Sequence, residues 1–130
     1  MSFFKNIFTS DDAQIPSNIA WNHLKDLNQL KNLIDESEHK PVLIFKHSTR
    51  CSISSMALNR FERSEPASNV DFYLLDLLSF RNISNEIADQ FNVHHQSPQI
   101  LLIHKGECIF DESHNAIAMD EVAEQVALLV

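Results

Sequence analysis

The chain has 130 residues, a usual length for one domain built around one hydrophobic core. Its hydrophobic content of 44% excludes a disordered chain, and its single glycine, Gly106, excludes the glycine-rich loops that bind phosphates and dinucleotides. The net charge is −8 and the ten Lys and Arg residues are scattered, so we expect no nucleic-acid binding.

We expect residues 1–18 to be an N-terminal lead-in and residues 19–130 to form the folded domain. The residues that would give a short helix in the lead-in its apolar face are Phe3, Phe4, Ile7 and Phe8. The opening lacks the charged-then-apolar pattern of a secretory signal, and no apolar run reaches the length of a membrane span. We therefore expect a cytoplasmic protein that does not bind membranes.

The hydrophobic pattern predicts strands and helices that alternate along the domain. In chain order these are a short strand within 18–24, a helix at 26–40, a strand at 41–47, a helix from residue 51, a strand at 70–77, a helix at 82–92, two strands within 100–111, and a helix at 119–130. Pro41 is expected to stop the first helix, and Asp120 to cap the last one.

The order β-α-β-α-β-α-β-β-α implies an α/β fold with a central mixed sheet covered by helices on both faces. The runs "PVLIFKH" and "VDFYLLDL" are apolar almost throughout, as expected of strands buried on both faces. The last two strands form a hairpin at Lys105-Gly106 and add an antiparallel edge. This is the order of elements in thioredoxin-like proteins.

Cys51 follows the strand at 41–47 and lies at the start of the next helix, where sites form in sheets of this kind. Free backbone N–H groups and the helix dipole favour an anion there, so the Cys51 thiolate is expected to be stabilised. Lys46, His47 and Arg50 would add positive charge nearby. The alternative is a buried and inert cysteine, which the polar neighbours make less favoured.

The motif Cys51-Ser52-Ile53-Ser54 has serine where a Cys-x-x-Cys pair would have its second cysteine. The Ser54 hydroxyl or N–H could donate a hydrogen bond to the thiolate, but it cannot form a disulfide. A mixed disulfide at Cys51 must therefore wait for an outside thiol, which suits exchange with a small-molecule thiol.

The segment "SPQ" at 97–99 precedes a strand, in the position of the cis-proline loop of thioredoxin-like proteins. We expect the Ser97–Pro98 bond to be cis. The Ser97 backbone would then lie beside the thiol and could pair with a bound peptide or thiol ligand. Thr49, Ser97 and Pro98 are therefore the expected ligand-binding residues.

These segments together resemble the YtxJ-like monothiol bacilliredoxins, also called bacillithiol system redox-active proteins. The resemblance extends from about Trp21 to the C-terminus and is carried by "FKHSTRCSIS", "SPQILLIHKG" and "SH" at 113–114. The family's motif more often has Thr at the position of Arg50 and Pro at the position of Ser52.

The resemblance implies a thioredoxin-like fold and a thiol-disulfide oxidoreductase that acts on bacillithiol mixed disulfides. The family's cysteine corresponds to Cys51 and its proline before the strand to Pro98. The implied partners are S-thiolated client proteins and a low-molecular-weight thiol as co-substrate, with no bound cofactor and no metal. The thiolate-stabilising residues would be Arg50, Ser54 and His47.

Two other functions remain open at this point. Two such domains could hold an iron–sulfur cluster through Cys51 and an added thiol, as monothiol glutaredoxins do. Alternatively, the domain could be a redox-inactive thioredoxin-like adaptor. Cys108 is expected to be a packed strand residue rather than a resolving thiol, and the adjacent His94 and His95 are expected to be solvated rather than metal ligands.

Overall fold

The computed structural model of the chain describes residues 17–129, so the helix expected in the lead-in lies outside the described residues. Within this part of the chain the elements follow the predicted order. They are β3 (Trp21–His23), α1 (Leu27–Glu36), β4 (Val42–His47), α2 (Ser52–Glu62), β5 (Asp71–Asp76), α3 (Arg81–Phe91), β6 (Gln99–His104), β7 (Glu107–Ser113), the 3-10 turn η1 (His114–Ala116) and α4 (Met119–Ala127).

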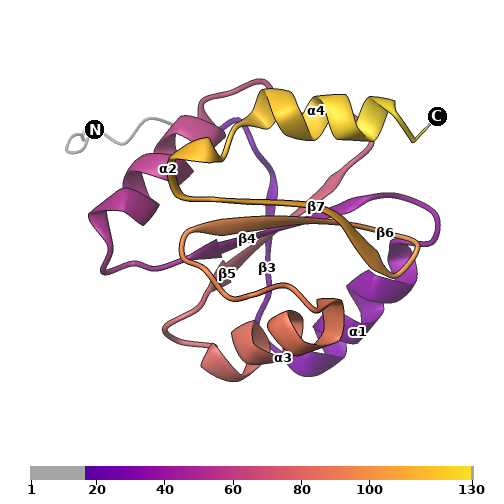
Figure 1. Cartoon of the computed structure of the whole chain (residues 1–130), viewed down its shortest axis with the longest axis horizontal. Coiled ribbons are helices and arrows are strands. Elements are labelled where there is room, and N and C mark those ends of the chain that lie inside the picture. The colour runs from indigo at the N-terminus through magenta and orange to yellow at the C-terminus, as the bar shows by residue number, and fades with distance from the viewer. Residues whose placement is uncertain (1–16, 130) are drawn as a thin grey trace, which may run out of the picture.

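The strands form one mixed sheet in the order β3-β5-β4-β6-β7. β3 and β4 both run parallel to β5, whereas β6 is antiparallel to β4 and β7 is antiparallel to β6. Helices α2 and α4 lie on one side of the sheet, and α1 and α3 lie on the other (Figure 1). The predicted thioredoxin-like fold is therefore confirmed. No helix in residues 17–129 is both long enough and apolar enough to cross a membrane.

Strand β4 is the centre of the core because it pairs on both edges and is buried on both faces. Leu43 and Phe45 pack with α2 and α4 on one face, and Val42 and Ile44 pack with α1 and α3 on the other. This alternation follows from the period of two residues in a strand. It also explains why the sequence of β4 reads as a continuous apolar run.

The aromatic side chains concentrate on the face of the sheet that carries α2. Trp21 lies with its ring centroid 6.1 Å from Phe45, 6.4 Å from Phe61 and 6.0 Å from Phe72. The Trp21 indole N–H donates a hydrogen bond to the Glu62 carboxylate at 2.6 Å. This cluster joins β3 to α2 and so fixes the helix that carries Cys51.

The helix ends differ from the sequence-based expectation at two places. α1 ends at Glu36, well before Pro41, because the buried Ser37 donates its hydroxyl to the Ile34 carbonyl and accepts the Gly106 N–H. α4 has Ala118 at its N-cap and no side-chain cap, so the prediction that Asp120 caps this helix is wrong. Asp120 lies in the first turn, where its negative charge interacts favourably with the helix dipole and stabilises the helix.

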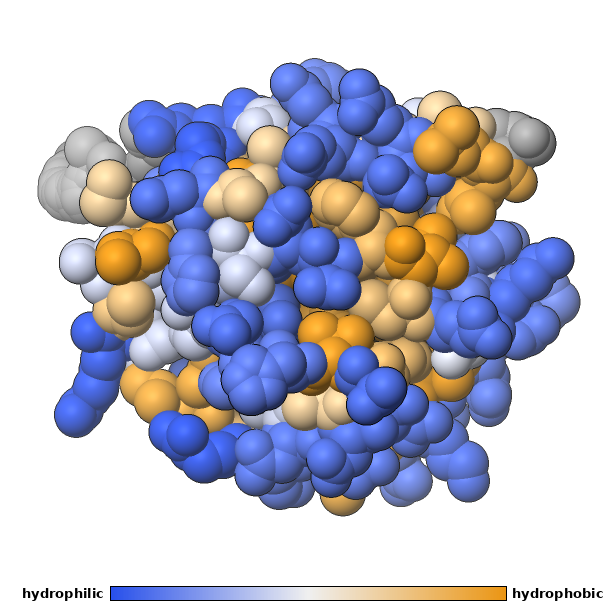
Figure 2. All heavy atoms as spheres, in the orientation of Figure 1, coloured by the Kyte–Doolittle hydropathy of each residue, from blue (hydrophilic) through white to orange (hydrophobic). Residues whose placement is uncertain are grey.

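The surface is mainly polar on the face drawn in Figure 2, as the charge of the chain suggests. An apolar patch interrupts it at the C-terminal end of α4 (Figure 2). The exposed side chains there are Leu128 and Leu129.

Lys46 is the exception in the apolar run of β4, because its side chain is fully buried. Its ammonium lies on the face covered by α3 and donates a hydrogen bond to the Ser84 carbonyl at 3.4 Å. Among the described residues no carboxylate forms an ion pair with it. Burial lowers the pKa of Lys46 from 10.5 to about 8.

We predict that Lys46→Met raises the free energy of unfolding at pH 7 by about 1 kcal/mol, because it replaces a buried ammonium with an apolar chain of similar length. The lowered pKa of Lys46 sets the pH dependence. The folded-state pKa lies below the unfolded value, so unfolding takes up a proton between pH 8 and pH 10.5 and wild-type stability rises through this range. The advantage of the variant should therefore shrink at pH 9. Urea denaturation at pH 7 and pH 9 measures it.

The matched control is Lys31→Met, on the exposed side of α1. It should change stability little and equally at both pH values. An advantage of Lys46→Met that is the same at pH 7 and pH 9 would contradict the account of Lys46.

Candidate functional site

Cys51 lies at the carboxyl end of β4 and is the N-cap residue of α2. The thiol is free and half-buried, and the side chain makes no capping hydrogen bond. The backbone around it is fixed, since the Cys51 N–H donates to the Ser48 carbonyl at 3.2 Å and the Cys51 carbonyl accepts from the Ser55 N–H at 3.0 Å. The backbone therefore holds the sulfur at the start of a helix, and the sulfur itself makes no hydrogen bond to the helix N-terminus.

Thr49 and Arg50 are the two central residues of the tight turn that the Cys51–Ser48 hydrogen bond closes. Both residues are exposed. The turn thus presents a cationic side chain directly before the thiol, where it can meet an anionic group on a ligand.

The loop before β6 reaches the same end of the sheet. The Ser97–Pro98 peptide bond is cis, as its position before a strand predicted. Gln99 pairs with Lys46 across β4 and β6, so the loop lies opposite the end of β4 from which the chain continues to Cys51. The Ser97 hydroxyl is buried and has no hydrogen-bond partner among the described residues.

His47 and Ser54 contact each other directly, which the sequence did not suggest. The Ser54 hydroxyl is fully buried and lies 2.6 Å from Nδ1 of His47. It also accepts a hydrogen bond from the Ser48 backbone N–H at 3.0 Å. These two partners engage the hydroxyl, and the hydrogen bond to the Cys51 thiolate that the sequence suggested for the Ser54 hydroxyl or N–H stays a prediction.

Two carboxylates from separate elements, Asp76 of β5 and Glu62 of α2, influence the pKa of His47. Burial lowers the pKa of His47, and the carboxylates of Asp76 and Glu62 oppose this by favouring the charged ring. Asp76 pairs with His47 across β4 and β5, whereas Glu62 lies at the end of α2. The Asp76 carboxylate accepts from the Leu78 N–H at 3.3 Å and the Ser79 hydroxyl at 2.9 Å.

Lys46 does not contribute to the site in the way its proximity in sequence suggested. Successive residues of a strand point to opposite faces, so Lys46 faces α3 while His47 faces α2. Of the three basic residues expected near Cys51, His47 therefore contacts the first turn of α2 through Ser54, and Arg50 directly precedes Cys51 in the chain.

Cys108 lies in β7 opposite Ile103, towards the other end of the β6–β7 hairpin from Pro98. Burial raises the pKa of its thiol to about 11, and the thiol donates to the Phe110 carbonyl at 3.4 Å. Both cysteines are free thiols. The position fits the packed strand residue that was expected.

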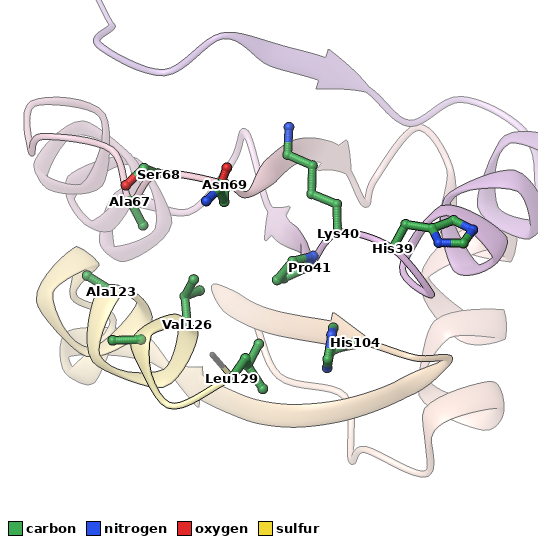
Figure 3. Close-up of a pocket in the computed structure, with 11 residues that line it drawn as sticks. His39, Lys40, Pro41, Ala67, Ser68, Asn69, His104, Ala123, Val126 and Leu129 are labelled. Carbon is green, nitrogen blue, oxygen red and sulfur yellow. The ribbon is translucent and has the colours of Figure 1, made fainter.

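Two further kinds of site are relevant in the described part of the chain, namely metal-binding clusters and cavities. In residues 17–129 no group of three or more His, Cys, Asp or Glu side chains is arranged to hold a metal ion. A cavity of about 400 Å³ lies between α4 and the end of β4 that is remote from Cys51 (Figure 3). Its polar side includes His39, Lys40 and His104. None of the predicted site residues lines it.

Comparisons with known proteins identify the family of the chain and support its thioredoxin-like fold. The sequence profile of the family described as monothiol bacilliredoxin BrxC matches residues 22–122. A solved structure described as a candidate oxidoreductase with a thioredoxin fold is 31% identical, with a TM-score of 0.71 over 80% of this chain and 91% of that chain.

More distant structures share the fold alone. The thioredoxin of Malassezia sympodialis is 16% identical, with a TM-score of 0.66 over 92% of this chain and 97% of that chain. A thioredoxin of Schistosoma mansoni is 18% identical, with a TM-score of 0.64 over 88% of this chain and 99% of that chain. Because the profile match extends from β3 to α4 and covers more than half of the sequence, the chain belongs to the monothiol bacilliredoxin family.

Proposed function

We propose that this protein removes bacillithiol, or a related low-molecular-weight thiol, from mixed disulfides on client proteins. The observation that carries the proposal is the state of Cys51. Its sulfur lies at a helix start, is half-buried, and makes no capping hydrogen bond. Serine occupies the position at which an internal thiol would otherwise resolve the product, so the chemistry stops at a mixed disulfide.

The reaction consists of two thiol–disulfide exchanges with no net oxidant. The Cys51 thiolate attacks the bacillithiol sulfur of the client mixed disulfide, and the bond from that sulfur to the client sulfur breaks. The client leaves as a thiolate and takes a proton from water. A second small thiolate then attacks the bacillithiol sulfur on Cys51, which releases the Cys51 thiolate and a symmetrical small-molecule disulfide.

The residues around the thiol have separate roles in this proposal. Arg50 and Thr49 form the exposed turn that receives the small thiol, and the Arg50 guanidinium binds its carboxylates. The backbone at Ser97 and Pro98 pairs with the extended client segment on the other side. His47 and Ser54 support the thiolate from within the domain. We infer a cytoplasmic location, because the reaction needs a pool of reduced small thiols.

Cys51→Ser should reduce the release of bacillithiol from a client mixed disulfide to the uncatalysed rate, because no other positioned thiol can attack. Cys108→Ser should stay within about twofold of wild type, since burial raises the pKa of that thiol to about 11 and keeps it protonated at neutral pH. Liberated bacillithiol is measured by mass spectrometry, with a glutathione mixed disulfide of the same client in parallel. Substantial activity in Cys51→Ser, or a large loss in Cys108→Ser, would reject the assignment of Cys51.

Ser54→Cys should rebuild a Cys-x-x-Cys pair at the start of α2 and make the protein resolve its own adduct. The new thiol would compete at an effective concentration of about millimolar order, as for short tethers. The Cys51–bacillithiol adduct should therefore build up in wild type and become scarce in the variant, as intact mass after mixing with oxidised bacillithiol would record. Ser52→Cys, one position after Cys51, is the matched control. An adduct that accumulates in Ser54→Cys without an internal disulfide would show that residue 54 is not in the resolving position.

A further inference from the structure

The Ser54 hydroxyl has three hydrogen-bonding sites to divide among its polar neighbours. A serine hydroxyl has one proton to donate and two lone pairs that can accept. One lone pair is taken by the Ser48 backbone N–H, which can only donate. A single lone pair and a single proton remain for Nδ1 of His47 and for any third partner.

The direction of the contact between His47 and Ser54 depends on the proton of the imidazole. When His47 is neutral and carries its proton on Nε2, Nδ1 is an acceptor, so Ser54 must donate its only proton to it. When His47 is charged, Nδ1–H donates to the last free lone pair of Ser54. The Ser54 proton is then released for another acceptor.

Cys51 is the acceptor that the start of α2 offers to this proton. Ser54 follows Cys51 by one helical turn, and the N-cap side chain and the third helical residue lie on the same side of a helix start. The Cys51 sulfur makes no capping hydrogen bond. A thiolate there would be an acceptor one helical turn before a hydroxyl whose proton has become free.

We propose that His47 and Ser54 form a proton-coupled positioning pair, in which Ser54 donates its proton to the Cys51 thiolate only when His47 is protonated. The inference deepens the proposed function, on which it rests, because it assigns the support of the attacking sulfur to two residues that do not contact the substrate. Thiolate and imidazolium then stabilise each other through one hydroxyl.

The proton balance of the coupled step is simple. The Cys51 thiol loses one proton and His47 gains one. Ser54 carries one proton before and after the step, and it changes only the acceptor of that proton, from Nδ1 of His47 to the Cys51 thiolate. No electron moves until the thiolate attacks a disulfide. After the adduct forms, Cys51 carries no charge, so His47 can return its proton to solvent and Ser54 turns back to Nδ1.

Two carboxylates act on His47 in the direction that this coupling requires. Asp76 of β5 and Glu62 of α2 both favour the charged form of the ring. Glu62 is held in place by the Trp21 indole N–H at 2.6 Å. Burial acts in the opposite direction and is the larger effect, so the ring is neutral at neutral pH until a further negative charge forms nearby.

The test is the titration of the His47 ring followed by nuclear magnetic resonance before and after Cys51 is alkylated with iodoacetamide. Alkylation removes the thiolate, so the pH midpoint of His47 in wild type should fall by about one unit, a tenfold change in proton affinity. In Ser54→Ala the midpoint should be the same before and after alkylation. A wild-type midpoint that alkylation leaves unchanged, or an equal fall in wild type and Ser54→Ala, would overturn the proposal.

The rate of Cys51 alkylation at pH 7 gives a second readout, with the modified cysteine identified by peptide mass. Ser54→Ala should react about tenfold more slowly than Ser52→Ala, which makes the same change two residues earlier, at an exposed position of the helix. Equal rates in the two variants would reject the role of Ser54. If Ser54→Ala does not fold, a wild-type midpoint that alkylation leaves unchanged still overturns the proposal.

Neither measurement uses bacillithiol. An intact coupling together with an inactive client assay would reject the proposed substrate and leave the role of His47 and Ser54 standing. Activity on the client mixed disulfide without the coupling would reject the role of His47 and Ser54 and leave the proposed substrate standing.

Discussion

The pairing of β4 with both β5 and β6 is the constraint on which the site depends. Two hydrogen-bonded neighbours fix the register of β4, and the register fixes which side chain faces which layer of helices. His47 is thereby directed to α2 and to Ser54, whereas Lys46 is directed to α3 and away from the thiol. A shift by one residue would exchange these two bases and remove the imidazole from the site.

The turn after β4 connects this register to the Cys51 sulfur. The Ser48 carbonyl accepts the Cys51 N–H, and the Ser48 N–H donates to the Ser54 hydroxyl. One residue therefore ties the N-cap of α2 and its first turn to the end of the strand. Ser54 is then more than a replacement for a lost cysteine, because a thiol at that position would be a weaker acceptor for the same N–H.

The two ends of the sheet carry different surfaces. The turn, the helix start and the cis-proline loop meet at the end where β4 finishes, and this end holds the exposed Thr49 and Arg50. The cavity beside α4 lies at the other end, and none of the residues predicted for the site lines it (Figure 3). The aromatic cluster around Trp21 lies between the sheet and α2, and it holds the helix, and so the thiol, in a fixed place.

The sequence alone determined the order of the elements, the type of sheet and the position of Cys51 at a helix start. These follow from local patterns, namely the apolar run of β4, the helical spacing in α1 and the proline before β6. The end of α1 and the capping residue of α4 were not predictable, since Ser37 stops α1 through contacts with Gly106 from a distant hairpin and Ala118 takes the N-cap of α4. Only the tertiary structure decided which basic residue meets the site, because strand register separates Lys46 from His47. It also decided that the Ser54 hydroxyl binds His47 and Ser48, since that contact joins a strand end to a helix turn and no spacing in the chain encodes it.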